Sequence, residues 1–403
     1  MRKISLWTIV IVLSLSLVGG YALAGCAAEP AAEEPVAEDP VVEDPVVEDP
    51  EPVAEEPVDD PVDEPAEEEG RLAGKHIGFV NAGPDDYYAQ FGDALVALAQ
   101  MEGANVTELN SDYSPTQELA NVQDLIAAGV DAIAVITAGA AGSAATIEAA
   151  YEADVPIFFI AGKPEIYPGT DLTGHVADNF VIMGYQVGQW VADNHPDAIS
   201  VKIPGFLGQG PAEGEIVGYQ MAMEENGMEP AYLTASSEWQ RTLAIPITED
   251  LLASGREFDV LFACNEETAA GVITVFEEQG IEPGEKIIIS CNGKEDGWEF
   301  IRQGWMQATS PNPPSLNADL CVQQMIRHFS GEDFAQYLQI MPWDVLTIDN
   351  LDQAIPWNVP NYLAGREAGD FEYRLDFYEA NYLENQEMFE EFDRALIEYL
   401  EAN

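Results

Sequence analysis

The stretch Glu118–Ile136, ELANVQDLIAAGVDAIAVI, joins a helix to a buried strand and decides the fold class. Its first half belongs to a pattern that predicts a helix over Thr116–Ala128. Its second half continues into DAIAVIT (Asp131–Thr137), a nearly continuous apolar run. Such runs are typical of parallel strands that helices cover on both faces.

The same alternation extends in both directions from this stretch. Upstream lie the strand KHIGFVNAG, a helix over Tyr88–Glu102 and the strand NVTEL; downstream lie a helix over Gly142–Ala153 and the strand VPIFFIAG. A second set follows, with strands AISVKIPGF, AYLTASS, FDVLFACN, EKIIISCNG and WMQATS, and helices that include Pro211–Asn226, Ile247–Ser254 and Leu316–His328. We therefore predict an α/β protein with two doubly wound parallel-sheet lobes and a ligand in the crevice at the carboxyl ends of the strands.

The N-terminus has the features of an export signal. Arg2 and Lys3 precede an apolar run, Leu6–Val18, that is shorter than the roughly 20 residues of a membrane span. The run leads to Leu23-Ala24-Gly25-Cys26, which resembles the bacterial lipoprotein box. The resemblance implies a signal peptide over residues 1–25 and a lipid anchor on Cys26; the alternative is an ordinary signal peptide with a chance cysteine.

The next segment has a composition of its own. Residues 27–70 hold 19 Asp and Glu and no Lys or Arg, with Pro at short intervals and the repeat PVVEDPVVEDP. Frequent proline blocks helices and sheets, and like charges extend a chain. We expect residues 26–71 to be a disordered acidic linker that holds the folded part away from a membrane.

Charge and composition exclude several classes of function. The formal net charge of the chain is -58, so it lacks the clustered Lys and Arg that bind nucleic acid or anionic lipid. Four Cys and four His leave little material for a metal site, so we expect no metal and no cofactor. The acidity is typical of proteins from a salt-rich habitat, or of a generally acidic set of exported proteins. We expect the protein to be a monomer.

The order of these sequence segments resembles that in the type I periplasmic sugar-binding proteins, which are the ribose- and galactose-binding receptors of ABC importers. ELANVQDLIAAGVDAIAVI is similar to the family's second helix and third strand, and VPIFFIAG to its fourth strand. VADN (Val176–Asn179) is similar to the first crossing between lobes, VLFACNEETAAGV to the strand and helix with a ligand-binding Asn, and IIISCNG to a GFDG-like turn. The resemblance covers about Lys75–His328.

The family fold implies two lobes joined by three hinge crossings. We expect these near Asp178, near Ser310–Asn312 and near Pro342–Asp349. The N-terminal lobe would then comprise residues 72–178 and 312–345, and the C-terminal lobe residues 179–311 and 346–403. QEMFEEFDRALIEYLEA at the end predicts an extra amphipathic helix on one lobe.

The resemblance also implies ligand-binding residues in the first lobe. Asp85, Tyr87 and Tyr88 match a family stretch like Asn-Pro-Phe-Phe, so Asp85 would accept hydrogen bonds from hydroxyls and a Tyr ring would stack on the ligand. Asn81 ends the first strand, where the family often places a polar contact. The alternatives are a turn with a helix cap for Asp85 and an ordinary strand-end group for Asn81.

The second lobe and the second crossing supply the rest of the predicted site. Trp239 matches a stacking aromatic, and Asn265, Asn292 and Asn312 match polar ligand contacts of the family. A core Trp and turn-closing Asn residues are the alternatives. Glu213 lies near the place where the family often has Arg, and it completes the predicted set.

Departures from the family pattern bear on the class of ligand. The family often has Asp-Arg after the fourth strand, where this chain has Ala161-Gly162, and neither expected Arg is present. Lys163 and Arg241 are the basic groups left nearby. We therefore expect a pocket that favours a polyol, a modified sugar or an amine over a sugar acid.

These observations predict a solute-binding lipoprotein that delivers a sugar or sugar-like molecule to an ABC permease, on the outer face of the bacterial cytoplasmic membrane. The alternative is an extracellular sensor that feeds a signalling protein, with a nucleoside or amine as possible ligand. We expect no enzyme, because the chain lacks a G-x-S-x-G elbow and a nucleophile–base set. Cys264 and Cys291, on neighbouring strands, are expected to remain thiols rather than form a disulfide.

Overall fold

The computed structural model describes residues 70–402, apart from residues 163, 165, 209 and 341–343. The signal peptide, Cys26 and nearly all of the acidic linker therefore lie outside the described residues. Two parallel sheets organise the described part, with strand orders β11-β5-β4-β3-β1-β2 and β10-β9-β8-β6-β7. The strands of the first sheet are β1 (His76–Asn81), β2 (Asn105–Asn110), β3 (Ala132–Ile136), β4 (Ile157–Ile160), β5 (Gly174–Asp178) and β11 (Tyr337–Ile340). Those of the second are β6 (Ser200–Ile203), β7 (Tyr232–Leu233), β8 (Val260–Ala263), β9 (Ile287–Asn292) and β10 (Ala308–Pro311).

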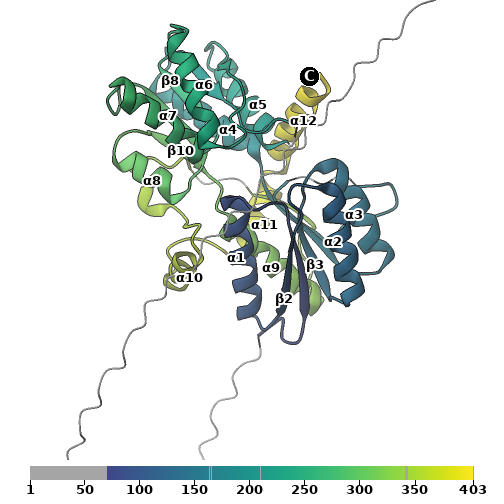
Figure 1. Ribbon diagram of the computed structural model, residues 1–403. Helices are drawn as coiled ribbons and strands as arrows, with labels where there is room; N and C mark the ends of the chain where they lie inside the picture. Colours follow the sequence, from purple (N-terminus) through teal and green to yellow (C-terminus); the bar gives the residue numbers. More distant parts are fainter. Residues whose placement is uncertain (1–69, 163, 165, 209, 341–343, 403) are drawn as a thin grey trace, which may run out of the picture. The chain divides into compact units, whose positions relative to one another are not determined.

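Helices follow nearly every strand, as the alternating pattern predicts (Figure 1). The first lobe contains α1 (Asp86–Met101), α2 (Pro115–Ala128), α3 (Ala140–Glu152) and α9 (Pro314–Ser330). The second contains α4 (Phe180–Asn194), α5 (Pro211–Glu225), α6 (Arg241–Ala253), α7 (Glu266–Gln279) and α8 (Glu295–Arg302). A C-terminal segment adds the 3-10 turn η1 (Leu351–Gln353), α10 (Val359–Ala368), α11 (Leu375–Glu384) and α12 (Gln386–Ala402).

The helix within the decisive stretch shows how local sequence sets these boundaries. Ser114 precedes α2, and its side chain accepts a hydrogen bond from the backbone N–H of Gln117 at 3.3 Å. Pro115 occupies the first turn, where its missing N–H costs nothing. Gly129 ends the helix with φ of 75°, a left-handed conformation that glycine adopts readily. The chain then turns directly into β3.

The strands of the first lobe are buried on both faces. In β3, Ala132, Ala134 and Ile136 belong to the core that also contains residues of α1 and α9. The intervening Ile133 and Val135 belong to a second core, which they share with residues of α2 and α3. Alternate side chains thus point to opposite faces, which accounts for the continuous apolar runs in the sequence.

The second lobe repeats this arrangement. Leu261 and Ala263 of β8 pack in a core with residues of α7 and α8, and Val260 and Phe262 pack in another with residues of α4 and α5. The prediction of an α/β fold with two doubly wound parallel lobes is confirmed.

The chain passes between the two lobes at three places that the family fold implies. It leaves β5 at Asp178 for α4, and it leaves β10 at Pro311 for α9. After β11 it returns to the second lobe, where Leu346 forms an antiparallel bridge with Thr309 of β10. Residues 341–343, part of this third passage, lie outside the described residues.

The C-terminal segment differs from the prediction that residues 346–403 belong to the second lobe. Tyr362 of α10 and Tyr378 of α11 lie in the core of the first lobe, with α1 and α9. Phe389 and Phe392 of α12 pack on Val217 of α5 and on α4, in the second lobe. The apolar residues of 355–384 are buried against the first lobe. The chain therefore crosses between the lobes two more times than predicted.

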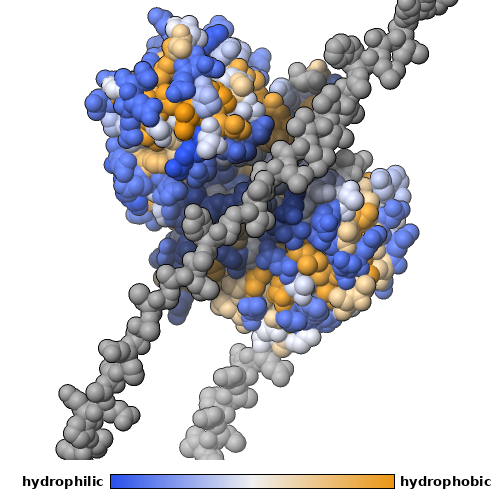
Figure 2. All heavy atoms as spheres, viewed as in Figure 1, coloured by the Kyte–Doolittle hydropathy of each residue, from blue (hydrophilic) through white to orange (hydrophobic). Residues whose placement is uncertain are grey.

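The view in Figure 2 shows a surface that is largely hydrophilic, with smaller hydrophobic areas on both lobes, as the acidic composition predicts. Among the described residues, no helix combines the length and the apolar character that a membrane crossing needs.

Candidate ligand-binding site

Topology places the candidate site at the carboxyl ends of both sheets. In the first sheet β1 lies between β2 and β3, and in the second β6 lies between β7 and β8, so the chain winds away from each in opposite directions. In such sheets ligands bind beside this reversal, at the carboxyl ends of the strands. Asn81 ends β1 and Asn292 ends β9, while Asn265 and Asn312 follow β8 and β10.

Three of the predicted residues meet at the second passage between the lobes. The hydroxyl of Tyr87, in the first turn of α1, donates a hydrogen bond to Oδ1 of Asn312 at 3.3 Å. The backbone N–H of Asn312 donates to the carbonyl of Asn292 at 2.8 Å. Asn292 has φ of 93°, a left-handed conformation that is unusual for a residue with a side chain. Such local strain is a reason to suspect a functional role.

The other predicted residues of the first lobe hold one another in place. Asp85 caps α1, since its Oδ1 accepts from the Tyr88 N–H at 3.1 Å and its Oδ2 from the Tyr113 hydroxyl at 2.6 Å. Asn81 donates through Nδ2 to the Tyr88 carbonyl and to Glu108, both at 2.9 Å. The side chain of Asp85 therefore caps α1. The buried Oδ1 of Asn81 has no hydrogen-bond partner among the described residues.

In the second lobe, Trp239 and Asn265 are also brought together. Glu238 and Trp239 both have positive φ, of 51° and 64°. The indole lies against Gly205, so closely that a Cβ on this glycine would lie 2.3 Å from the ring. Nδ2 of Asn265 donates to the Trp239 carbonyl at 3.2 Å, while its Oδ1 caps α7 by accepting from the Thr268 N–H at 2.8 Å.

Glu213 lies in the first turn of α5, where its carboxylate is bonded to the preceding loop. It is 5% exposed, and its two carboxylate oxygens accept from the backbone N–H groups of Gly208 and Gly210. These bonds hold the glycine-rich loop before α5 and stabilise the start of that helix. The contacts of Glu213 support a role in shaping the loop and give no support to a ligand contact.

Asp178 and Asn317 are candidate residues that the sequence reasoning missed. Asp178 ends β5 and is 7% exposed; its Oδ2 accepts from Nδ2 of Asn317 at 2.6 Å. Burial raises the pKa of Asp178 to about 7, against the effect of this hydrogen bond. Oδ1 of Asn317 is buried without a partner among the described residues. The signal was available, because Asp178 belongs to the VADN segment at the first crossing.

The buried carboxyl group of Glu266 supports the turn that follows Asn292. Oε1 of Glu266 accepts from the Gly293 N–H at 2.9 Å and from the Thr309 hydroxyl at 2.8 Å. Glu266 is 2% exposed, and burial raises its pKa to about 8. It therefore fixes the turn after β9 against β10, and with it the position of Asn292.

Basic groups near the site are neutralised by acidic neighbours. Lys294, in the second lobe, lies 2.7 Å from Asp86 at the start of α1 and 3.3 Å from Asp296. Arg241 lies 3.2 Å from Glu267. Lys163 lies outside the described residues. Paired cations of this kind leave little free positive charge for an anionic ligand.

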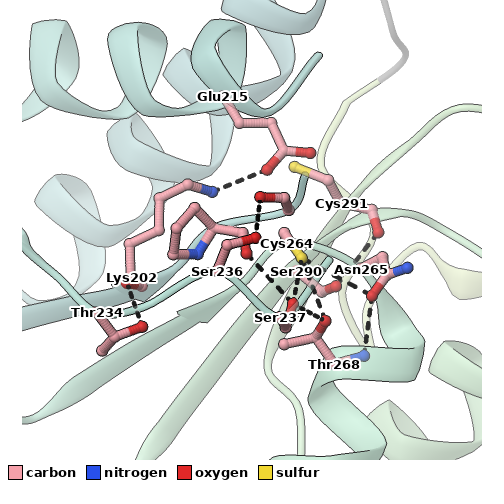
Figure 3. Close-up of polar contacts among 12 residues, drawn as sticks. Lys202, Glu215, Thr234, Ser236, Ser237, Cys264, Asn265, Thr268, Ser290 and Cys291 are labelled. Carbon is pink, nitrogen blue, oxygen red and sulfur yellow. Dashed lines mark hydrogen bonds and ion pairs between the residues drawn. The ribbon is translucent and has the colours of Figure 1, made fainter. Parts of the chain in front are cut away.

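A buried ion pair lies beneath the second-lobe side of the site (Figure 3). Nζ of Lys202 lies 2.8 Å from Oε2 of Glu215, and the side chains are 1% and 0% exposed. The ammonium also lies 3.3 Å from the centre of the Phe262 ring. Cys264 and Cys291 are both buried free thiols, as predicted, and Cys264 contacts Thr268 and Ser237.

Comparison with known protein families identifies the family to which this fold belongs. Residues 77–333 match the periplasmic binding protein domain family. The chain belongs to the type I periplasmic binding protein family. The resemblance first stated from sequence phrases is thereby confirmed, and the family match ends before the C-terminal segment that contains α10–α12.

Known relatives of this binding protein are solute-binding proteins. It is 23% identical over 250 residues to the ribose import binding protein of Haemophilus influenzae, covering 61% of this chain and 82% of the relative. It is 27% identical over 254 residues to a xylitol-binding protein of Mycolicibacterium smegmatis, covering 61% and 69%. The arabinofuranose-bound periplasmic component of the arabinose ABC transporter from Shewanella sp. ANA-3 superposes with a TM-score of 0.64 at 20% identity, covering 73% of this chain and 97% of that one.

Proposed function

We propose that this binding protein is the extracytoplasmic receptor of an ABC importer and holds a neutral sugar or polyol between its lobes. The observation that carries this proposal is the contact of Tyr87 with Asn312, with Asn292 directly beside it. This contact joins the predicted ligand face of α1 to the ends of two second-lobe strands.

The chemistry of the site suits hydroxyl groups. A hydroxyl both donates and accepts, and an Asn amide offers an acceptor and two donors in one plane. Tyr87 and Trp239 add flat apolar faces for the C–H surfaces of a sugar ring. A ligand between lobes is shielded from water, so each unmatched polar group costs about 1–3 kcal/mol and the site becomes selective.

The charges of the site favour a neutral ligand over an anionic one. Arg241 pairs with Glu267 and Lys294 with Asp86, while the carboxyl group of Asp178 is buried near Tyr87. The relatives named for ribose, xylitol and arabinose support the same class. A sugar acid would meet this acidic environment, and the described basic groups Arg241 and Lys294 are already paired with acidic side chains.

The N-terminal residues support an anchored form of this receptor. We infer that residues 1–25 are a signal peptide, that Cys26 carries a lipid and that residues 26–71 tether the lobes near a membrane permease. Mass spectrometry of the membrane-bound protein would detect this as an N-terminal lipidated Cys26; a mature protein that begins elsewhere would contradict it.

A thermal-shift panel tests the proposed function. Residues 70–403 would be heated with ribose, arabinose, xylitol, myo-inositol, glucuronate, adenosine and putrescine. A neutral sugar or polyol at 100 times its Kd should add about 2.7 kcal/mol of stability and raise the midpoint by several degrees. Stabilisation by glucuronate alone, or by adenosine or putrescine with no response to the sugars and polyols, would contradict the proposal.

A further inference from the structure

Trp357 belongs to the segment that follows the family domain. The family match ends at residue 333, and Trp357 lies between η1 and α10. Ile355 and Val359, on either side, are buried in the core of the first lobe, so the segment has a fixed place. The family match, which covers residues 77–333, therefore gives no information about the role of Trp357.

Three hydrogen bonds to side chains of two helices, α8 and α9, hold the segment at the passage between the lobes. Oε1 of Glu295, at the start of α8 in the second lobe, accepts from the N–H groups of Trp357 and Asn358 at 2.9 and 3.1 Å. The hydroxyl of Ser315, in the first turn of α9, donates to the carbonyl of Pro356 at 2.7 Å. Asn312 lies two residues before the start of α9.

The indole of Trp357 contacts the candidate site itself. Its ring packs edge-on against Tyr87, with 5.4 Å between centroids, and Tyr87 is the residue that bonds to Asn312. The side chain is 3% exposed, yet its Nε1 has no hydrogen-bond partner among the described residues. Buried polar groups are nearly always paired, so an unpaired indole N–H beside a ligand site calls for a partner that comes with the ligand.

We propose that Trp357 is a ligand-binding residue and that its indole N–H donates a hydrogen bond to an oxygen atom of the bound molecule. This inference rests on the proposed function, because it takes the space beside Tyr87 and Asn312 as the ligand site. The segment after the family domain then forms one wall of that site, next to the first turn of α1.

The chemistry of the indole restricts the chemical class of the ligand. An indole nitrogen only donates, so its partner must be an acceptor such as a hydroxyl or ring oxygen. The carboxylate of Asp178 and the unpaired Oδ1 of Asn317, nearby on β5 and α9, accept and so call for donors. A polyhydroxylated compound meets both needs, because each hydroxyl group can donate and accept.

Replacement of Trp357 by phenylalanine tests the proposal, since phenylalanine keeps most of the ring packing and loses the donor. The titrant is whichever of ribose, arabinose, xylitol and myo-inositol binds most tightly in calorimetry. We expect W357F to raise its Kd about five- to tenfold, the effect of one lost hydrogen bond. The control W305F changes a Trp in the second-lobe core and should leave Kd within about twofold of the original value.

A Kd for W357F within about twofold of the original value would overturn the proposal, even if the variant is less stable. Nuclear magnetic resonance gives a second test that needs no ligand. The indole N–H of Trp357 should exchange with solvent faster than that of Trp298, which donates to the Gly293 carbonyl at 2.8 Å, because the N–H of Trp357 has no acceptor among the described residues and opening of the lobes exposes it. If no sugar or polyol binds, the proposed function fails. Exchange as slow as that of Trp298 would separately show that Trp357 is a core residue.

Discussion

Replacement of Glu215 by glutamine should lower the free energy of unfolding by about 3 kcal/mol at pH 8. The variant leaves the ammonium of Lys202 buried without its counter-ion, 2.8 Å from where the carboxylate lay. Removal of one partner from a buried ion pair generally costs about 3–5 kcal/mol, because the remaining charge stays buried without compensation.

An exposed ion pair of the same lobe gives the matched control. Arg302 and Glu299 lie 3.7 Å apart with side chains 52% and 55% exposed, so E299Q should cost less than about 1 kcal/mol. Urea unfolding of both variants measures the difference. A loss below about 1 kcal/mol for E215Q would show that water reaches Lys202 and that the pair is not a structural element of the second lobe.

Stability should fall as pH rises from about 5.5 to 7.5, and Glu266 should be one of the causes. Its pKa is raised from 4.5 to about 8 in the folded protein, so it holds a proton there that the unfolded chain has already lost. Stabilisation from such a group is complete below the unfolded pKa and disappears as pH rises through the folded pKa. The expected slope from this one group is about −1.4 kcal/mol per pH unit.

The variant E266Q isolates this contribution, because an amide accepts from Gly293 and Thr309 but does not titrate. Its stability should decline about 1.4 kcal/mol per pH unit less steeply than that of the original protein over this range. E267Q, at the neighbouring partly exposed position, is the control and should leave the slope unchanged. Equal slopes for E266Q and the original protein would mean that Glu266 is ionised in the folded state.

Most of the fold follows from local sequence, and the exceptions have physical reasons. Strands such as β3 and β8 are buried on both faces and therefore appear as continuous apolar runs. By contrast β5, GHVAD, contains Gly, His and Asp, and β11 lies at the edge of its sheet with Tyr337 and Gln339. Their place comes from pairing with each other and with β4, which no local pattern reveals.

The candidate site was predicted only in part for a related reason. Residues at strand ends, such as Asn292, can be located once the strands are known, and Tyr87 and Asn312 meet as the fold implies. The partners of Asp85 and Glu213 depend on loop conformation, which the sequence does not determine. Trp357 lies 45 residues after Asn312 in the chain, and only the tertiary packing of the C-terminal segment brings it to Tyr87.

The C-terminal segment has a structural consequence for movement of the lobes. Asp393 of α12 accepts from Asn179 at the first passage at 3.2 Å and from Gln339 of β11 at 2.8 Å. This helix therefore attaches to the N-cap residue of α4 and to a residue of β11. Because α10 and α11 pack on the first lobe and α12 on the second, we expect any movement of the lobes to displace this segment as well.

One ligand is expected to contact both lobes at the same time. Calorimetric titration of Y87L and W239L with the tightest neutral ligand tests it directly, since one residue lies at the start of α1 and the other in the second lobe. Both variants should raise Kd about 100-fold, because each removes an aromatic face from a closed site, while thermal melting shows that they remain folded. If either variant binds the ligand as tightly as the original protein, the ligand does not lie between the lobes at these residues.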